Sequence, residues 1–341
     1  MTATPIAILH AGLVTSVGLD ASSTCAALRA KLANPTDTHF IDSAGRWIGG
    51  HAVRLPQSQR GLDKLVEMAA MATEETLADV PRDDWAELPL LLCVAETARP
   101  GRPDTLDTHF FPALQDRLKA RFSAHSAVVA QGRVGVAVAL GAARSLIDRQ
   151  AARQVLIVAA DSLLQAASLA HYDRNRRLLT ETNSDGFIPG EGGGALLVGK
   201  VDGSPQLRCT GLGFASEPAP IDSGEPLRAE GLTRAIREAL DEARVAMHEL
   251  DFRIADIAGE QYYFKEASLA LSRSMRTVKQ EFDLWHPAEC IGETGAVAGI
   301  GMLALAAAAC RKSYAKGNAI MAHWSNDNGL RAAATLHYGP T

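Results

Sequence analysis

The residues that could most readily do chemistry lie in a glycine-rich run. Five glycines fall between Gly186 and Gly194, in the stretch TNSDGFIPGEGGGALLVGK. Such a run can hold a phosphate where it joins a strand to the start of a helix, because free N–H groups there point at the anion. Here a strand-like apolar run follows the glycines instead, and no Gly-Lys-Ser/Thr follows them. We therefore predict a tight structural corner and no cofactor, with the corner residues Asp185, Gly186, Gly190, Glu191, Gly192 and Gly194.

Cysteines are the next candidates for chemistry. The chain has an odd number of them and no Cys-x-x-Cys pair: Cys25, Cys93, Cys209, Cys290 and Cys310. This pattern favours reduced, mostly buried thiols in a cytoplasmic protein over a disulfide framework or a zinc site. We predict no metal site.

The elements that would position a functional site are apolar, strand-like runs that alternate with helix-like segments. Buried strands are expected over residues 5–12, 88–96, 125–131, 154–162 and 204–216, with later strands over 253–260, 319–325 and 333–339. Helices are expected over residues 20–32, 61–80, 132–150, 232–247 and 290–312. Such alternation indicates an α/β architecture with covered sheets.

The two halves of the chain resemble each other. Each contains a strand, a glycine-containing turn and a helix rich in small residues, GVAVALGAAR in the first half and GAVAGIGMLALAAAAC in the second. Two such helices packed together at the centre of the fold would explain the small residues. We predict a duplicated unit with halves at residues 1–203 and 204–341.

Composition excludes several classes of function. The 341 residues are 47% hydrophobic and 21% charged, with a net charge of −5 and no long block of either sign. This gives no electrostatic footprint for nucleic acid or an anionic membrane. The longest apolar stretch, residues 299–310, is shorter than the ~20 residues of a membrane span. The N-terminus lacks the basic start and apolar segment of a signal peptide, so we expect a cytoplasmic protein.

The glycine-rich stretch DGFIPGEGGGALLVGK resembles the corresponding corner of the β-ketoacyl synthases, in the thiolase-fold superfamily. Residues 6–30 are similar to the family's opening strand, loop and helix, and VLIVAADSLL to the strand before its acidic turn. The resemblance implies a five-layered αβαβα fold of two duplicated halves, an obligate dimer and condensation of acyl chains on a phosphopantetheine arm. The family's catalysts are a cysteine at a strand-to-helix elbow and two histidines, helped by a lysine and a glycine–phenylalanine loop.

Other residues stand at each of those catalytic positions. Gln131 and Gly132 occupy the elbow, Gly259 and Glu260 stand where the first histidine belongs, and Glu293 replaces the second. Ala288 stands at the lysine position, and residues 325–334, including Asp327, replace the loop. Condensation needs a nucleophile and imidazole donors, whereas an ionised carboxylate only accepts hydrogen bonds. These positions are therefore expected to be vestigial: Gln131, Gly132, Gly259, Glu260, Glu293 and Asp327.

The polar residues at these positions allow two interpretations. Gln131, Glu260, Glu293 and Asp327 could converge for acid–base work, or they could fill a vestigial cleft and bind one another and water. We favour the second, since no nucleophile or metal set accompanies them. Glu191, which lies near the turn lysine in the family, is expected to have lost its partner because position 288 is alanine.

Two hypotheses for function remain. The first is a non-catalytic scaffold that keeps the thiolase-like dimer, similar to the short thiolase-like proteins of type VI secretion effector loci, and that recruits an effector or adaptor. Residues 96–104, ETARPGRPD, resemble that group but also suit a plain exposed loop. The second is a synthase-like acyltransferase, or the inactive, chain-length-factor-like partner of a synthase, working with an acyl carrier protein. In either case the resemblance implies a dimer, expected to be a homodimer. Its subunits are expected to contact each other near residues 126–131.

Overall fold

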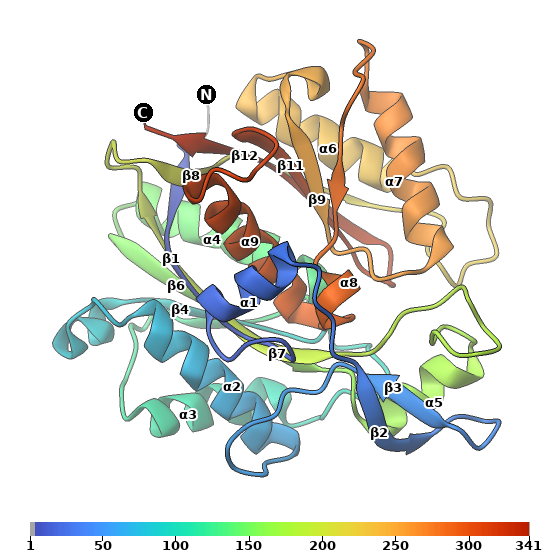
Figure 1. Cartoon of the computed structure of the whole chain (residues 1–341). Coiled ribbons are helices and arrows are strands. Elements are labelled where there is room, and N and C mark those ends of the chain that lie inside the picture. Colours follow the sequence, from blue (N-terminus) through green and yellow to red (C-terminus); the bar gives the residue numbers. More distant parts are fainter. Residues whose placement is uncertain (1–3, 341) are drawn as a thin grey trace.

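A continuous sheet runs through the protein, whose computed structural model describes residues 4–340 (Figure 1). Within those residues ten strands form the sheet, in the order β5-β4-β6-β7-β1-β8-β12-β11-β9-β10. The N-terminal strands are β1 (Ile6–Val14), β4 (Leu90–Val94), β5 (Ala127–Ala130), β6 (Gln154–Ser162) and β7 (Glu191–Lys200). The C-terminal strands are β8 (Gln206–Ser216), β9 (Phe252–Ala255), β10 (Leu284–Trp285), β11 (Ala319–Ser325) and β12 (Leu330–Gly339).

The two halves of the sheet repeat one arrangement. In the first half β4 runs parallel to β5 and β6, while β7 is antiparallel to β6 and β1. In the second half β9 runs parallel to β10 and β11, while β12 is antiparallel to β11 and β8. The halves join where Ile6, Ala7 and Ile8 of β1 pair with Leu207, Arg208 and Cys209 of β8. The fold is thus a duplicated α/β unit. The division into 1–203 and 204–341 falls between β7 and β8 and stays a prediction.

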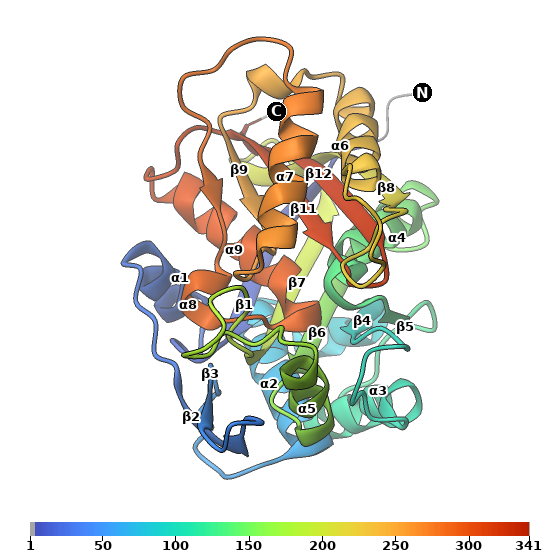
Figure 2. The same cartoon turned by 90° about the vertical axis from the view of Figure 1, so that its right-hand side faces the viewer.

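Helices cover both sheet halves and fill the space between them (Figures 1 and 2). One outer layer holds α2 (Gly61–Thr76) and α3 (Leu106–Leu118), the centre holds α4 (Gly135–Asp148) and α9 (Ala298–Arg311), and the other outer layer holds α6 (Glu230–Ala243) and α7 (Gln261–Ser274). The result is the expected five-layered arrangement. Smaller elements lie beside these layers: α1 (Ala21–Arg29), α5 (Ala166–Arg174), α8 (Ala288–Ile291) and the hairpin β2 (Thr36–Ile41) and β3 (Trp47–Gly50).

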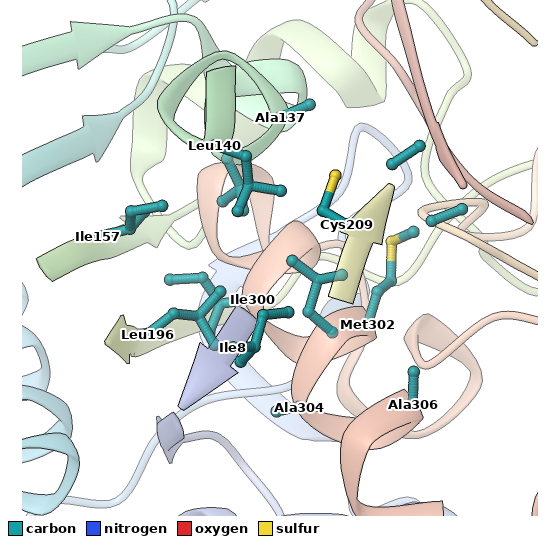
Figure 3. Packing of buried hydrophobic residues seen from close by; sticks show 14 of the residues in the cluster. Ile8, Ala137, Leu140, Ile157, Leu196, Cys209, Ile300, Met302, Ala304 and Ala306 are labelled. Carbon is teal, nitrogen blue, oxygen red and sulfur yellow. The ribbon is translucent and has the colours of Figure 1, made fainter. Parts of the chain in front are cut away.

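The central layer is packed as the small residues predict. Helix α9 has almost no polar face, which is typical of a helix that is buried on all sides. A Cβ added to Gly299 of α9 would lie only 2.7 Å from the Cβ of Val136 in α4, so glycine permits the close approach of the two helices. Figure 3 shows Ile300 and Met302 of α9 in one cluster with Ile8 of β1, Leu140 of α4 and Leu196 of β7.

Some elements differ from the expectation. The helix expected over 232–247 ends at Ala243, because Arg244 adopts a left-handed conformation with φ of 56° and Met247 falls in a separate 3-10 turn. The hairpin β2–β3 and helices α3, α5 and α7 were not predicted. Residues 96–104 are not a plain exposed loop, since the Arg99 side chain turns inward and is 7% exposed.

All five cysteines are free and buried. In the part of the chain that the structure describes, no group of three or more His, Cys, Asp or Glu side chains could hold a metal ion. None of the helices between residues 4 and 340 is both long enough and apolar enough to span a bilayer.

Candidate functional site

Two equivalent elbows face each other at the centre of the fold, one before each central helix. After β5 the chain passes through Gln131, with φ of −122° and ψ of 15°, and Gly132, with φ of +52°, into a 3-10 turn and then α4. Before α9 it passes through Thr294, with φ of −107° and ψ of 14°, and Gly295, with φ of +57°, into a second 3-10 turn. Positive φ favours glycine at both bends. Each half of the duplicated fold therefore has an elbow before its central helix; the first follows strand β5 and the second follows the short helix α8.

Each elbow is held by a side chain from the other half. The Asn326 amide donates to the Gln131 carbonyl (2.8 Å), and its oxygen accepts from the Val134 N–H (3.3 Å). Asp161, which lies in β6, accepts from the Ala296 N–H at the second elbow (2.9 Å). Both interactions satisfy backbone donors at the start of a helix, where four N–H groups lack intrahelical partners.

Arg133 follows the elbow glycine and points into the space between the halves. Its guanidinium donates to the Glu293 carboxylate (3.1 Å), to Asp327 (2.6 Å) and to the Tyr263 hydroxyl (2.7 Å). The Tyr263 hydroxyl in turn donates to Asp327. The Arg133 side chain is 9% exposed, so these charge-assisted bonds are shielded from water.

Arg177 binds the carboxylates of Glu260 and Asp327. It donates two hydrogen bonds to Glu260 (2.6 and 2.8 Å) and two to Asp327 (2.7 and 3.1 Å). Asp327 thus lies between two arginines. A third arginine, Arg99, donates two hydrogen bonds to Asp161 (2.5 and 2.6 Å) behind the second elbow.

Very little space remains inside this cluster of charges. The cavity that Glu96, Arg133, Tyr172, Arg177 and Asp327 help to line has a volume of about 20 Å³. A cavity needs roughly 10–15 Å³ to hold one water molecule. The site can therefore hold a water, but no acyl chain fits without rearrangement of the ion pairs.

Burial and the arginines act in opposite directions on the carboxyl groups. Burial raises the pKa of Glu293 to about 7, with Arg133 opposing the rise. Burial also raises the pKa values of Glu96 and Glu260. Burial alone would raise the pKa of Asp327, but Arg133 and Arg177 outweigh it and hold that pKa far below its ordinary value. Asp327 is therefore the permanent anion of the site, whereas Glu293 changes charge near neutral pH.

The structure brings three of the predicted vestigial residues together: Glu260, Glu293 and Asp327 all enter this cluster. Gln131 contributes its backbone carbonyl to the Asn326 bond. Gly259 lies elsewhere, against the glycine-rich corner, where a Cβ would come within 2.4 Å of the Gly186 carbonyl oxygen. The carboxylates bind arginines rather than one another.

The glycine-rich corner pairs with the turn that carries Glu293. The Gly190 N–H donates to the Glu293 carbonyl (2.8 Å), and the Glu293 N–H donates to the Ile188 carbonyl (2.9 Å). A Cβ at Gly190 would lie 2.5 Å from the Ile291 carbonyl oxygen, so only glycine allows this approach. Gly192 and Gly194 lie inside β7 itself, and the Asp185 carboxylate accepts from the Gln261 N–H (2.7 Å).

Glu191 is not left without a partner, which corrects the expectation from the sequence. It forms an ion pair with Lys64 of α2. It also accepts from the Val53 N–H (2.9 Å) and the Ser162 hydroxyl (2.9 Å). A lysine of α2 is thus the cationic partner of Glu191.

Sequence reasoning missed the cations of the site. The sequence did not predict these three arginines, nor four other residues that contact them or the elbows. The full set is Glu96, Arg99, Arg133, Asp161, Arg177, Tyr263 and Asn326. One signal was present: Arg133 is the only charged residue between Ala127 and Ala143. A lone arginine in an otherwise apolar segment needs a buried partner.

Comparisons with known proteins extend this picture. No family model matches the chain. A putative polyketide β-ketoacyl synthase 2 from Streptomyces cyaneus is 32% identical over 128 residues. That match covers 36% of this chain and 30% of the other protein, so the chain aligns with less than a third of this curated relative's length.

Solved structures match over nearly the whole chain. The ishigamide ketosynthase/chain length factor has a TM-score of 0.70 at 19% identity, covering 98% of this chain and 99% of that chain. A ketosynthase in complex with its chain length factor, from Xenorhabdus doucetiae, has a TM-score of 0.75 at 13% identity, covering 98% of each. The α/β class and the duplicated five-layered arrangement expected from the sequence are confirmed. The chain has the thiolase-like fold shared by ketosynthases and chain length factors.

Proposed function

We propose that this chain is a non-catalytic partner protein with a ketosynthase-like fold, comparable in role to a chain length factor. One observation carries the proposal: where a condensing site would need a thiol and room for an acyl chain, Arg133 and Arg177 hold three carboxylates around a cavity of about 20 Å³. Condensation through a thioester needs a nucleophile next to an open acyl site.

The charge pattern of the site supports the same proposal. A condensing site stabilises developing negative charge with preorganised hydrogen-bond donors. Here the donors of Arg133 and Arg177 are already engaged by Glu293, Glu260 and Asp327. A second anion would therefore compete with existing buried partners. The cluster acts instead as a brace that ties the two halves together, since Arg133 follows β5 whereas Glu293 and Asp327 belong to the second half.

The surface that would meet a partner is the edge strand β5. It is the last strand of its sheet half, and Ala127, Val128, Val129 and Ala130 are exposed or partly exposed. Figure 2 shows β5 beside β4 at the rim of the molecule. An edge strand carries unpaired N–H and C=O groups that can add a strand from another chain. Pairing of two β5 strands would give either a homodimer or a complex with a catalytically intact ketosynthase, in the cytoplasm.

Two other roles rest on resemblance. An accessory role in loading a type VI secretion effector or adaptor draws on the chain's size and on residues 96–104, whose Arg99 is committed to Asp161. Activity as an acyltransferase on carrier-protein substrates would need the ion-pair cluster to open. The closed ion-pair cluster disfavours the acyltransferase role, and the similarity to ketosynthase/chain-length-factor structures supports the partner role over the secretion role.

Native purification tests the proposal. The protein would be tagged in its own host, purified at low salt and analysed by native mass spectrometry. The partner role predicts a stoichiometric complex with a ketosynthase that has its cysteine. A stoichiometric complex with a secretion effector would support the accessory role instead. A protein that stays monomeric at micromolar concentration, with no partner, would contradict every role based on a dimer.

A further inference from the structure

A second cavity lies away from the central cluster, where α1 packs beside α8 and α9 (Figure 1). Its volume is about 410 Å³, and none of its lining residues belongs to the ion-pair cluster. Apolar side chains from several elements form its wall: Leu28 of α1, Trp285 of β10, Leu305 of α9 and Pro287, which directly precedes α8. Trp285 is fixed against Phe252, with ring centroids 4.5 Å apart. This cavity is thus within the size range of small-molecule sites and has a rigid aromatic wall.

Arg29 stands at the mouth of this cavity over an aromatic ring. Its guanidinium carbon lies 4.4 Å from the ring centroid of Tyr314. Arg29 and Tyr314 also line an adjoining cavity of about 370 Å³, together with Lys312. The two cavities therefore share one cationic and aromatic border.

The cations at this border lack acidic partners. Among residues 4–340, no ion pair includes Arg29 or Lys312. Two acidic residues line the first cavity, and each is paired with a lysine: Glu289 lies 3.7 Å from Lys31, and Asp283 lies 3.4 Å from Lys316. Arg29 therefore borders both cavities without an acidic partner, and Lys312 adds a second such cation at the adjoining cavity.

We propose that this border binds a small carboxylate with an apolar or aromatic body. A guanidinium whose carbon lies over a ring can still bind a carboxylate through two of its N–H groups. The body of the ligand would lie against Leu28, Trp285 and Leu305. The concave shape favours a small molecule over a protein segment, which would need a longer groove. This site is independent of the proposed partner role, because it shares no residue with β5 or with the ion-pair cluster.

Matched probes test the charge requirement. We would measure binding of 4-phenylbutyrate, neutral 4-phenylbutanol and inorganic phosphate to the full-length protein by calorimetry and by saturation-transfer NMR. The site predicts that 4-phenylbutyrate binds and that the alcohol binds about tenfold more weakly, because the charge-assisted bonds are lost. Equal affinity for acid and alcohol would overturn the role of Arg29. Binding of phosphate as tight as that of 4-phenylbutyrate would overturn the role of the apolar wall.

Variants locate the site. Arg29→Gln and Lys312→Gln alter exposed side chains and are expected to fold, and each should weaken 4-phenylbutyrate binding several-fold while the alcohol is unaffected. Leu305→Trp should block binding of both by filling the cavity. Arg234→Gln, which removes an exposed arginine from α6, is the matched control and should bind as the wild type does. Unchanged binding in Arg29→Gln, or equal loss in Arg234→Gln, would overturn the proposal.

Discussion

The Glu96 carboxylate occupies the space that a side chain at residue 132 would need. A Cβ added to Gly132 would lie 2.0 Å from Glu96 Oε2, at an elbow where φ is +52°. The partly buried Glu96 carboxyl group thus fills the volume beside the elbow glycine, one residue after Gln131. The backbone of the elbow and the position of Glu96 are thus coupled, because a side chain at residue 132 would require Glu96 to move.

Gly132→Ala should destabilise the protein. A left-handed backbone costs a non-glycine residue about 1–2 kcal/mol, and Glu96 must also move. Gly141→Ala is the matched control in α4, because its added Cβ would lie 3.8 Å from Leu212 and the substitution favours the helix by about 0.5–1 kcal/mol. Urea unfolding should give opposite signs for the two variants. Equal stabilities would mean that the elbow is not constrained as described.

Gln131→Cys should not restore condensation. The new thiol would stand at the elbow, but Glu293 and Glu260 supply no imidazole donor and the cavity of about 20 Å³ has no room for an acyl chain. We expect neither a thioester with acetyl or malonyl groups by intact-protein mass nor a condensed product. Acylation of the variant beyond the wild-type level would show that the cavity opens.

Arg177→Met should cost far more stability than loss of a surface arginine. It leaves the buried Glu260 carboxyl without its partner, and breaking a buried ion pair typically costs about 3–5 kcal/mol. Arg117→Met, which removes half-exposed pairs with Glu67 and Glu74, should cost about 1 kcal/mol or less. Chemical denaturation of both variants gives the comparison. Similar losses of stability in the two variants would show that the central cluster contributes no more to stability than surface ion pairs do.

Glu293 should make the wild type lose stability as pH rises. Its pKa is raised from 4.5 to about 7 in the folded protein, so the folded state binds more protons than the unfolded state between those pH values. Stability therefore falls across that interval and levels off above it, by a few kcal/mol in total for a shift of this size. His323 acts in the opposite direction, since burial lowers its pKa to about 3 and stability rises as pH increases toward 6.5.

Glu293→Gln isolates this contribution. The difference in unfolding free energy between wild type and variant should change between pH 4.5 and 7 and stay constant above. The exposed control Glu225→Gln should follow the wild type throughout. A constant difference for Glu293→Gln across the interval would show that the carboxyl group titrates normally.

Elements with strong local signals could be predicted from the sequence. The continuous apolar run over 154–162 coincides with β6, and the small-residue helix was placed at the centre as α9. Helix α3 was missed because Pro112 lies inside it, where proline is normally disfavoured. The strands β2 and β3 are short, with sequences TDTHFI and WIGG, so periodicity gives little evidence for them.

The site was only half predictable, for a physical reason. The carboxylates could be found by comparison with a known family, because the resemblance puts Glu260 and Glu293 at its histidine positions and Asp327 in its catalytic loop. Their partners could not, because Arg133 and Asp327 are 194 residues apart and Arg177 and Glu260 are 83 apart. Nothing in local spacing indicates which of many charged residues meet across a duplicated fold. The same holds for Lys64 and Glu191, separated by 127 residues.

The central claim is that the site between the two elbows does no acyl chemistry. The direct measurement is to incubate the wild-type protein with malonyl- and acetyl-loaded carrier protein and to record its intact mass together with any released product. We predict an unmodified protein, no condensed product and no carbon dioxide above the background of a sample without protein. A covalent acyl adduct, a condensed chain or catalysed decarboxylation would contradict the account.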